Sequence, residues 1–563
     1  MGNFSEGVTE LYDAEVEKYF PGKRGNWRLS EFLLPNNLPL QGWKIHISAT
    51  PANALEILKN VGELVLKYHW QGKAIMSIEL LRKMNTGLFF GYSQIGKFIT
   101  IYCIDHVDFV EKISILKEST RTYTGPSVPS DMKVKDSSCL YYRYGNFQNS
   151  ENTIVDPQGN IILDGRLRRT AVPLWAKNQT TSIHFNNEDN SISLLDHGYL
   201  IYECLSQRGK GGVFKALSVL SQSIDNVIIK EGRKNGEEEH PGRDGYARLL
   251  NEHKILNILK DTKAKVPKVI KKIETEYRCL VITSYIPGIR LDEMISESLR
   301  TKHNLSFGQM VRLAFLLSEQ VGILHAMDIY HRDIKPANLI IDECAGISLI
   351  DFEGAHFGTE SIYDPWGSPG FAPPEWRTIQ NTDLIIKGDI YSIGATFFSL
   401  FTGSVYRSSS VKENDYHMSQ LPTTLSTLIK KMLSTEPDQR PTLPIVLQSL
   451  EQMNPDKHPT RFLVSIIDKV QRRNLRKIGN NKLTVAVKND TPFNHIIHIY
   501  DQHTTENHEV SGSPFSLSPG EISTPFEIYS IPNQYIGEVS ILREGGLMLY
   551  DIKFNENMVY SLS

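Results

Sequence analysis

The hydrophobic and polar positions of this 563-residue chain follow three successive patterns. The first part mixes helical patches at 53–67 and 77–84 with extended patches at 43–48 and 97–104. This mixture predicts an α+β domain, and the polar stretch that begins near residue 180 is typical of a linker.

The second pattern starts with strand-like residues 198–205, continues with further strands and a charged helix, and then becomes mostly helical. That order predicts an α+β domain with two unequal lobes. Beyond it, runs such as LTVAV, HIIHIY and GEVSIL alternate apolar and polar positions between Pro, Gly and Asn, which predicts a small all-β domain. We therefore expect a multidomain α+β protein with four segments: 1–190, 197–452, a basic helical connector at 453–480, and the β domain at 481–563.

Composition and charge limit the partners and the compartment. The chain has 61 Lys and Arg against 64 Asp and Glu, a formal charge of −3, so no overall basic field favours nucleic acid. No run reaches about 20 apolar residues, and the acidic start lacks the basic and apolar regions of a signal peptide. The five cysteines show no CxxC spacing, which favours a reducing compartment. We expect a cytoplasmic protein without a membrane span or a nucleic-acid partner.

The most specific motif is HRDIKPAN, from His331 to Asn338, followed thirteen residues later by DFEG, which starts at Asp351. Phosphoryl transfer needs a carboxylate that orients the attacking hydroxyl, and metal ligands that bring Mg²⁺ to the β and γ phosphates. Asp333 suits the first role. Asn338 and Asp351 suit the second. Lys335 can neutralise charge that develops on the γ-phosphate.

This motif resembles that of eukaryotic-type protein kinases, whose other landmarks follow in chain order. Lys230 in VIIK is similar to the strand lysine that grips the α and β phosphates, and Glu252 in RLLNEHKIL is similar to its partner on the neighbouring helix. Glu375 in APPE resembles the end of an activation segment. Asp389 and Arg440 match structural residues, and Arg440 is expected to pair with Glu375. The resemblance implies a bilobal kinase-like fold that uses ATP and Mg²⁺.

The expected nucleotide loop, SQRGKGGV, is a looser match to the kinase pattern. It keeps Gly209, Gly211 and Gly212 before Val213, without the full three-glycine spacing, and we expect these four residues to bind the nucleotide. Glu353 replaces the Gly of the usual DFG triplet. This replacement affects the expected flipping of the activation segment and does not affect the expected metal binding.

The first domain carries the residue types that eliminate phosphate from phosphoserine. That reaction needs a base for the Cα proton, an acid for the leaving oxygen and cations around the phosphate. Lys44 and His46 lie two apart in an extended run, so they point to one face, where a cation and an imidazole can meet one phosphate. A solvated strand face is the ordinary alternative for such a pair.

Several phrases resemble class III lanthipeptide synthetases, bacterial enzymes that join a phospho-Ser/Thr lyase domain to a kinase domain. They are GWKIHISATPAN (42–53), GYSQIGKF (91–98), YYRYGNF (141–147) and WGSPGFA (366–372), together with the DFE variant and the RGKGGVF loop. The resemblance covers about residues 10 to 450. It implies a phosphothreonine-lyase-like first domain, in which His46 is the general acid and Lys44 stabilises the phosphate or an enolate.

Three further residues complete the expected lyase site. Lys73 is the candidate base, since a desolvated amine beside other cations can lose its proton near neutrality. Arg143 is the expected bidentate phosphate clamp, and Lys97 is a second phosphate-binding candidate.

The resemblance implies a bifunctional dehydratase of a ribosomal precursor peptide that has a leader and a core with Ser, Thr and Cys. The kinase would phosphorylate Ser or Thr with ATP, and the lyase would remove the phosphate to give a dehydroamino acid. Two alternatives stay open: a Ser/Thr protein kinase whose first domain only binds phosphopeptide, and a catalytically silent scaffold.

The C-terminal part departs from the family. Its members commonly end in a large helical cyclase domain, often with zinc held by Cys and His. The last cysteine here is Cys344, and the pattern after the kinase is β, so we expect neither a zinc site nor a cyclase domain. A separate cyclase partner stays open.

Overall fold

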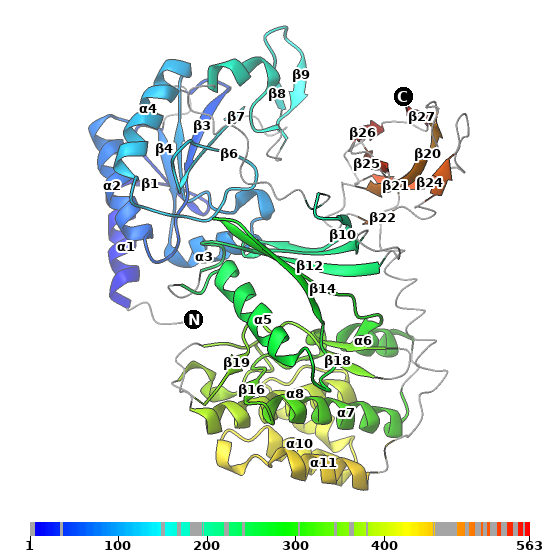
Figure 1. Ribbon diagram of the computed structural model, residues 1–563. Helices are drawn as coiled ribbons and strands as arrows, with labels where there is room; N and C mark the ends of the chain where they lie inside the picture. The colour runs from blue at the N-terminus through cyan, green and yellow to red at the C-terminus, as the bar shows by residue number, and fades with distance from the viewer. Residues whose placement is uncertain are drawn as a thin grey trace.

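The computed structural model is a mixed α/β protein with several sheets (Figure 1). It describes residues 6–33, 38–147, 153–165, 170–180, 194, 196–218, 225–238, 242–301, 305–342, 346–359, 365–378, 381–453, 455 and the eight strands between 481 and 562. The expected basic connector falls almost wholly outside the described residues, as does most of the expected linker after residue 180.

The first sheet has seven strands in the order β1-β2-β4-β5-β3-β7-β6. Their bounds are β1 Gly22–Arg24, β2 Trp27–Leu29, β3 Gln41–Ile47, β4 Gly72–Ile75, β5 Ile99–Tyr102, β6 Met132–Lys133 and β7 Leu140–Asn146. The helices of this part are α1 Glu6–Tyr19, α2 Ala54–Lys67, α3 Ile78–Thr86 and α4 His106–Ser119, with the short η2 Tyr92–Gln94 and η4 Leu174–Thr180. A separate hairpin joins β8 Thr153–Val155 to β9 Ile161–Leu163.

The two faces of this sheet differ in chemistry because successive side chains on a strand alternate. Ile45 and Ile47 of β3 and Ile101 of β5 are fully buried and belong to the hydrophobic core that α1, α2 and α4 complete. Trp43 stacks on Phe109 of α4, with ring centroids 4.6 Å apart. The opposite face is therefore the one that presents the polar residues of β3, β4, β5 and β7.

The expected kinase part begins with a five-stranded antiparallel sheet in the order β10-β11-β12-β14-β13. Its strands are β10 Tyr199–Arg208, β11 Gly211–Ser218, β12 Asp225–Arg233, β13 Val269–Glu274 and β14 Arg278–Ser284. One helix, α5 Gly245–Leu259, packs on this sheet, and the side chain of Asp244 accepts a hydrogen bond from the Ala247 N–H to cap it.

The second lobe is mostly helical and holds the largest hydrophobic core (Figure 1). Its helices are α6 Leu291–Thr301, α7 Phe307–His325, α8 Thr382–Thr402, α9 Val411–Ser419, α10 Thr423–Met432 and α11 Leu443–Gln452. Short strands β15 Ile289–Arg290, β16 Ile329–Tyr330, β17 Leu339–Ile341, β18 Ile347–Leu349 and β19 His356–Phe357 frame the loops between them, with the single turns η5 Pro336–Asn338, η6 Pro374–Arg377 and η7 Pro437–Gln439.

One helix of the described chain, α8, is long and apolar enough to cross a membrane. Within its most apolar 18-residue window, 78% is buried inside the protein, as expected for the central helix of a helical lobe. The four described cysteines are free thiols and buried: Cys103, Cys139, Cys204 and Cys279.

All elements described beyond residue 480 are strands. They are β20 Asn481–Asn489, β21 His495–Asp501, β22 His508–Glu509, β23 Phe515–Leu517, β24 Phe526–Ser530, β25 Gly537–Arg543, β26 Tyr550–Phe554 and β27 Met558–Leu562. One sheet has the order β24-β20-β27, and another has the order β22-β21-β25-β26 with β23 paired to β21.

The first domain directly contacts the five-stranded sheet of the expected kinase part. The Gly209 N–H, in the turn between β10 and β11, donates to the Thr86 carbonyl at the end of α3, at 3.1 Å. Arg233 at the end of β12 donates from Nη1 to the Tyr92 hydroxyl at 2.7 Å and from Nη2 to Glu231 at 2.6 Å. The hairpin that should cover a nucleotide therefore also touches the first domain.

Candidate active sites

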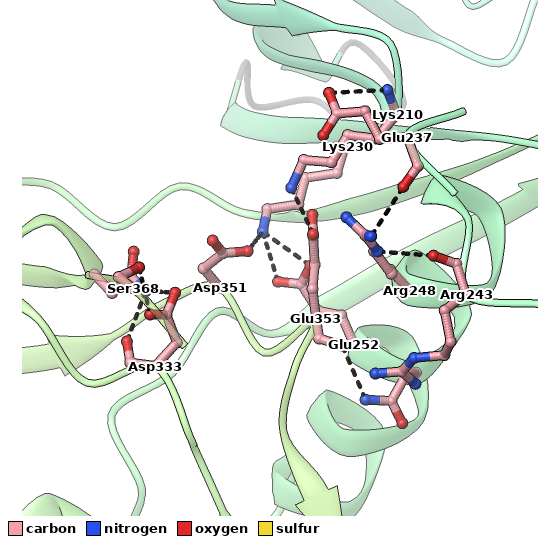
Figure 2. Close-up of polar contacts among 12 residues, drawn as sticks. Lys210, Lys230, Glu237, Arg243, Arg248, Glu252, Asp333, Asp351, Glu353 and Ser368 are labelled. Carbon is pink, nitrogen blue, oxygen red and sulfur yellow. Dashed lines mark hydrogen bonds and ion pairs between the residues drawn. The ribbon is translucent and has the colours of Figure 1, made fainter. Parts of the chain in front are cut away.

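Three charged side chains from separate elements meet in the kinase cleft (Figure 2). Lys230 on β12 donates to both carboxylate oxygens of Glu252 on α5, at 2.8 Å each, and to Asp351 Oδ1 at 3.0 Å. Burial alone would lower the pKa of Lys230, but the carboxylates of Asp351 and Glu252 raise it well above its usual value. The lysine is therefore a permanent cation, and the lysine–helix glutamate pair that an active kinase needs is formed.

The catalytic loop holds the carboxylate of Asp333 between three donors. Lys335 Nζ donates to Asp333 Oδ2 at 2.7 Å, and Asn338 Nδ2 donates to the same oxygen at 3.1 Å. The Ser368 hydroxyl donates to Asp333 Oδ1 at 2.7 Å and accepts a hydrogen bond from Lys335 at 2.7 Å. Sequence reasoning gave Ser368 no role, although it lies in the phrase WGSPGFA. This residue ties the activation segment to the catalytic loop.

Asn338 and Asp351 offer the hard oxygen donors that Mg²⁺ prefers. The Asn338 amide group also donates to the Asp333 carbonyl at 2.9 Å, which leaves Oδ1 as the atom that can bind a cation. The Ile350 N–H donates to the Asn338 carbonyl at 3.0 Å, so the two ligand segments are held together. The residues therefore fit a magnesium ion bound with ATP. One further group of the described chain, Glu252 with Asp351 and Glu353, has ligand atoms within 4.8 Å of one another.

The backbone of the catalytic loop is strained and is held by Asp389, which is 1% exposed. Arg332 has φ +65°, a conformation that non-glycine residues rarely adopt. Asp389 accepts hydrogen bonds from the N–H groups of His331 at 3.0 Å and Arg332 at 2.8 Å. Two charge-assisted hydrogen bonds therefore stabilise the turn that presents Asp333.

The expected pair of Arg440 and Glu375 is confirmed. Arg440 donates from Nη1 and Nη2 to the two Glu375 carboxylate oxygens at 2.6 and 2.9 Å. The Arg440 side chain is fully buried, and that of Glu375 is 14% exposed.

Arg440→Ala is expected to lower the free energy of unfolding of the kinase domain by about 3–5 kcal/mol, because it leaves the Glu375 carboxylate without its partner in a mostly buried position. Denaturant unfolding followed by tryptophan fluorescence measures this. The matched control is Lys430→Ala, which breaks an exposed pair with Asp415 and should change stability by no more than about 0.5 kcal/mol. Equal losses in the two variants would contradict the prediction.

The glycines of the expected nucleotide loop are needed for packing. A Cβ on Gly209 would lie 1.8 Å from the Asn85 carbonyl oxygen of the first domain, and a Cβ on Gly211, at φ +144°, would lie 1.8 Å from the Glu231 carbonyl oxygen. These close backbone approaches explain both glycines without a nucleotide. Nucleotide contact by Gly209, Gly211, Gly212 and Val213 stays a prediction.

The candidate lyase residues of the first domain share one face of its sheet. His46 on β3 pairs in register with Thr100 on β5, and Thr100 pairs with Lys73 on β4. Lys44 on β3 pairs in register with Arg143 on β7. Directly paired residues, and residues two apart on one strand, point to the same side of a sheet. Four strands therefore bring the expected cations and the imidazole to a common surface.

His46 is held by an acid that sequence reasoning missed. Its side chain is 5% exposed, and its Nδ1 hydrogen-bonds to the fully buried carboxylate of Asp131. Burial lowers the pKa of His46 to about 4 although Asp131 opposes this, so the imidazole is neutral at pH 7 and donates its Nδ1 proton to Asp131.

Asp131 is itself surrounded by donors. Lys97 Nζ lies 3.7 Å from Asp131 Oδ1, and the Ser130 hydroxyl donates to the same oxygen at 2.7 Å. Burial would raise the pKa of Asp131, but His46 and Lys97 together hold it far below its usual value. The structure thus places Lys97 beside the His46–Asp131 pair.

Arg143 is completely buried, and only part of its guanidinium group is hydrogen-bonded among the described residues. Its Nη2 pairs with Asp164 and donates to the Gly165 carbonyl at 2.8 Å. Its Nε and Nη1 are buried and make no hydrogen bond to the described residues. A buried guanidinium with two unused donors is costly unless an anion satisfies them. Because the guanidinium is fully buried and already pairs with Asp164, phosphate binding by Arg143 stays a prediction.

The other two lyase candidates make ordinary cation contacts. Lys44 Nζ donates to the Asn146 carbonyl and lies 5.4 Å from the centroid of the Phe147 ring. Lys73 Nζ lies 4.1 Å from the centroid of the Trp27 ring. The role of Lys73 as a base stays a prediction.

Comparison with known proteins identifies the two domains. A family model described as the RamC N-terminal domain matches residues 11–189, and one described as the protein kinase domain matches residues 202–451. The chain joins a RamC N-terminal domain to a protein kinase domain. Class III lanthipeptide synthetases have the same order of domains, and the resemblance of this chain to them is confirmed.

Individual relatives agree with the two families. The chain is 25% identical over 366 residues, 61% of its own length, to the probable SapB synthase of Streptomyces coelicolor, and it spans 38% of that protein. It is 30% identical over 195 residues to the human hormonally up-regulated neu tumor-associated kinase, of which it spans 26%. It is 28% identical over 239 residues to the Dictyostelium discoideum serine/threonine-protein kinase stk11 homolog, of which it spans 39%. The alignment with the synthase is longer than either kinase alignment.

Proposed function

We propose that this protein is a dehydratase that phosphorylates Ser or Thr of a ribosomal precursor peptide with ATP and then eliminates the phosphate. The observation that carries the proposal is the convergence of Lys44, His46 and Arg143 on one sheet face of a chain whose kinase cleft has its lysine–glutamate pair formed. A domain that only bound phosphate would need the cations but no imidazole–carboxylate pair.

In the kinase step, Asp333 orients the peptide hydroxyl and accepts its proton, while Lys335 lies beside the transferred phosphate. Lys335 and Ser368 both hydrogen-bond to Asp333, which fixes the direction of its carboxylate before a substrate arrives. Lys230 grips the α and β phosphates. Magnesium held by Asn338 and Asp351 would neutralise charge on the β and γ phosphates.

In the lyase step, the two unused donors of Arg143 bind the peptide phosphate, and Lys44 adds positive charge on the same face. His46, aligned by Asp131, lies at the leaving oxygen. A phosphate dianion would raise the pKa of His46 from its low value in the free protein, so that the proton needed by the leaving group arrives together with the substrate. A neighbouring amine removes the Cα proton; Lys73 is the candidate.

The second candidate function is a protein kinase whose RamC N-terminal domain only binds phosphopeptide. The low pKa of His46, about 4, favours it, since a neutral imidazole is a poor acid.

Intact-mass analysis of a precursor peptide, incubated with the protein and MgATP, separates the two functions. The dehydratase should first give a peptide that carries one phosphate and then a peptide that has lost one water. A phosphorylated end product that never loses water would support the binding domain and contradict the dehydratase. A peptide of unchanged mass would contradict both.

A further inference from the structure

The turn between β10 and β11 carries a lysine that enters the kinase cleft. The backbone of Lys210 is fixed, because its N–H donates to Glu237 Oε1 at 3.3 Å and its carbonyl accepts a hydrogen bond from the Arg233 N–H at 2.8 Å. Its side chain, 24% exposed, extends from the turn toward the loop that begins with Asp351 (Figure 2). Only the flexible four-carbon stem is left to move.

The partner of Lys210 is the residue that replaces the usual glycine after Asp351 and Phe352. Lys210 Nζ donates to Glu353 Oε2 at 2.5 Å, and the Glu353 side chain is 11% exposed. The backbone carbonyl of Glu353 accepts a hydrogen bond from Asn251 of α5 at 3.2 Å. Glu353 is thus anchored two residues from the candidate metal ligand Asp351.

The charges in this part of the cleft do not balance. Glu252, Asp351 and Glu353 bring three carboxylates whose ligand atoms lie within 4.8 Å of one another, and Lys210 and Lys230 bring two ammonium groups. Lys230 already has Glu252 and Asp351 as partners. Burial lowers the pKa of Lys210, but Glu353 and Asp351 raise it by more, so Lys210 is also a cation.

A nucleoside triphosphate would bring several more negative charges beside these groups. Lys210 can exchange one anionic partner for another without a change in its own charge. Its partner Glu353 lies within 4.8 Å of Asp351, the candidate metal ligand beside which the phosphates would bind. Resting on the proposed kinase function, we infer that Lys210 is a second phosphate-binding lysine of the ATP site, and that Glu353 competes with ATP for it in the nucleotide-free protein.

A simpler explanation is that the Lys210–Glu353 pair is a structural latch that holds the hairpin closed over the nucleotide. The two explanations predict opposite changes in ATP affinity when Glu353 is removed. A latch works only when both partners are present, so the loss of either residue should weaken ATP binding. A competitor weakens ATP binding while it is present, so the loss of Glu353 should strengthen it.

The experiment measures binding of MgATP and of adenosine by the full chain, using calorimetry. Lys210→Met keeps the length of the stem and removes the charge. It should weaken the binding of MgATP by about tenfold to a hundredfold, the usual effect of one charge-assisted hydrogen bond, and leave the affinity for adenosine unchanged. Glu353→Gln keeps the shape and removes the charge; it should tighten MgATP by about threefold to tenfold. The double variant should match Lys210→Met, since the competitor has no effect without the lysine.

Each other outcome overturns the inference. Weaker MgATP binding in both single variants would show a latch, and unchanged binding in both would show a surface pair without function. Equal weakening of MgATP and adenosine in Lys210→Met would show damage to the cleft. If Lys210→Met does not fold, as judged by its thermal unfolding, the opposite sign expected for Glu353→Gln still decides. Failure of the unaltered chain to bind MgATP would overturn the kinase function as well, whereas a wrong sign in a variant leaves that function intact.

Discussion

Asp351→Asn is expected to leave the precursor peptide unphosphorylated, with a rate at least about 10²-fold below that of the unaltered chain. Phosphoryl transfer depends almost wholly on positioning and charge neutralisation, and small errors in position already cost about that factor. The substitution keeps the volume of the side chain, and Lys230 keeps both hydrogen bonds to Glu252. Transfer of radiolabelled phosphate from ATP measures the effect, and both chains should carry His46→Ala so that the label stays on the peptide.

The control for this prediction is Asp383→Asn on α8. It makes the same chemical change in the same domain, but its carboxylate is 65% exposed and pairs only with Lys387 and solvent in the described contacts. Its phosphorylation rate should stay near that of the unaltered chain. A normal rate in Asp351→Asn would remove this residue from the metal site.

His46→Ala is expected to separate the two reactions. The kinase cleft is untouched, so phosphate should be added at a normal rate, and elimination should fall by about 10²- to 10⁴-fold, the usual contribution of a general acid. Phosphorylated peptide should therefore accumulate, which intact-mass analysis over time would show. His69→Ala, an exposed histidine of the same domain, is the control and should still yield dehydrated peptide.

Because His46 is buried against Asp131, its loss also leaves a buried carboxylate with fewer partners. Asp131→Asn tests the same step with less disturbance, since it keeps a hydrogen-bond acceptor for His46 and removes only the charge. It should also accumulate phosphopeptide. Normal dehydration in both variants would exclude the imidazole from the lyase reaction and leave Arg143 with Lys44 as a binding site.

The kinase cleft could be predicted from sequence because its spacing is local. HRDIKPAN places Asp333 and Asn338 on one loop, and the short connection to Asp351 keeps the two candidate metal ligands close. Ser368 was missed because it lies 35 positions from Asp333 in the chain, and no spacing in a single sequence predicts a hydroxyl partner at that distance. Lys210 was missed because the glycine loop was interpreted through its backbone alone.

The sheet face that carries the candidate lyase residues could be predicted only in part. The two-residue spacing of Lys44 and His46 correctly placed them on one face. The position of Lys73 on the same face depends on the strand order β4-β5-β3-β7, which is not the chain order and cannot be deduced from alternation. Asp131 lies in a loop 85 positions from His46, without a motif of its own, so its role became visible only in the folded chain.

The hydrogen bond between Gly209 and Thr86 links the first domain to the hairpin of β10 and β11, so a movement of the hairpin can be passed on to the first domain. If the two lobes of the kinase part separate to release ADP, the hairpin would move with the strand lobe. Either the whole first domain swings with it, or the hydrogen bonds of Gly209 and of Arg233 to the first domain break. In the first case a small rotation between the lobes becomes a large displacement at the distant edge of the seven-stranded sheet. A pair of fluorophores on that edge and on α11 would then report each nucleotide exchange as a change in distance.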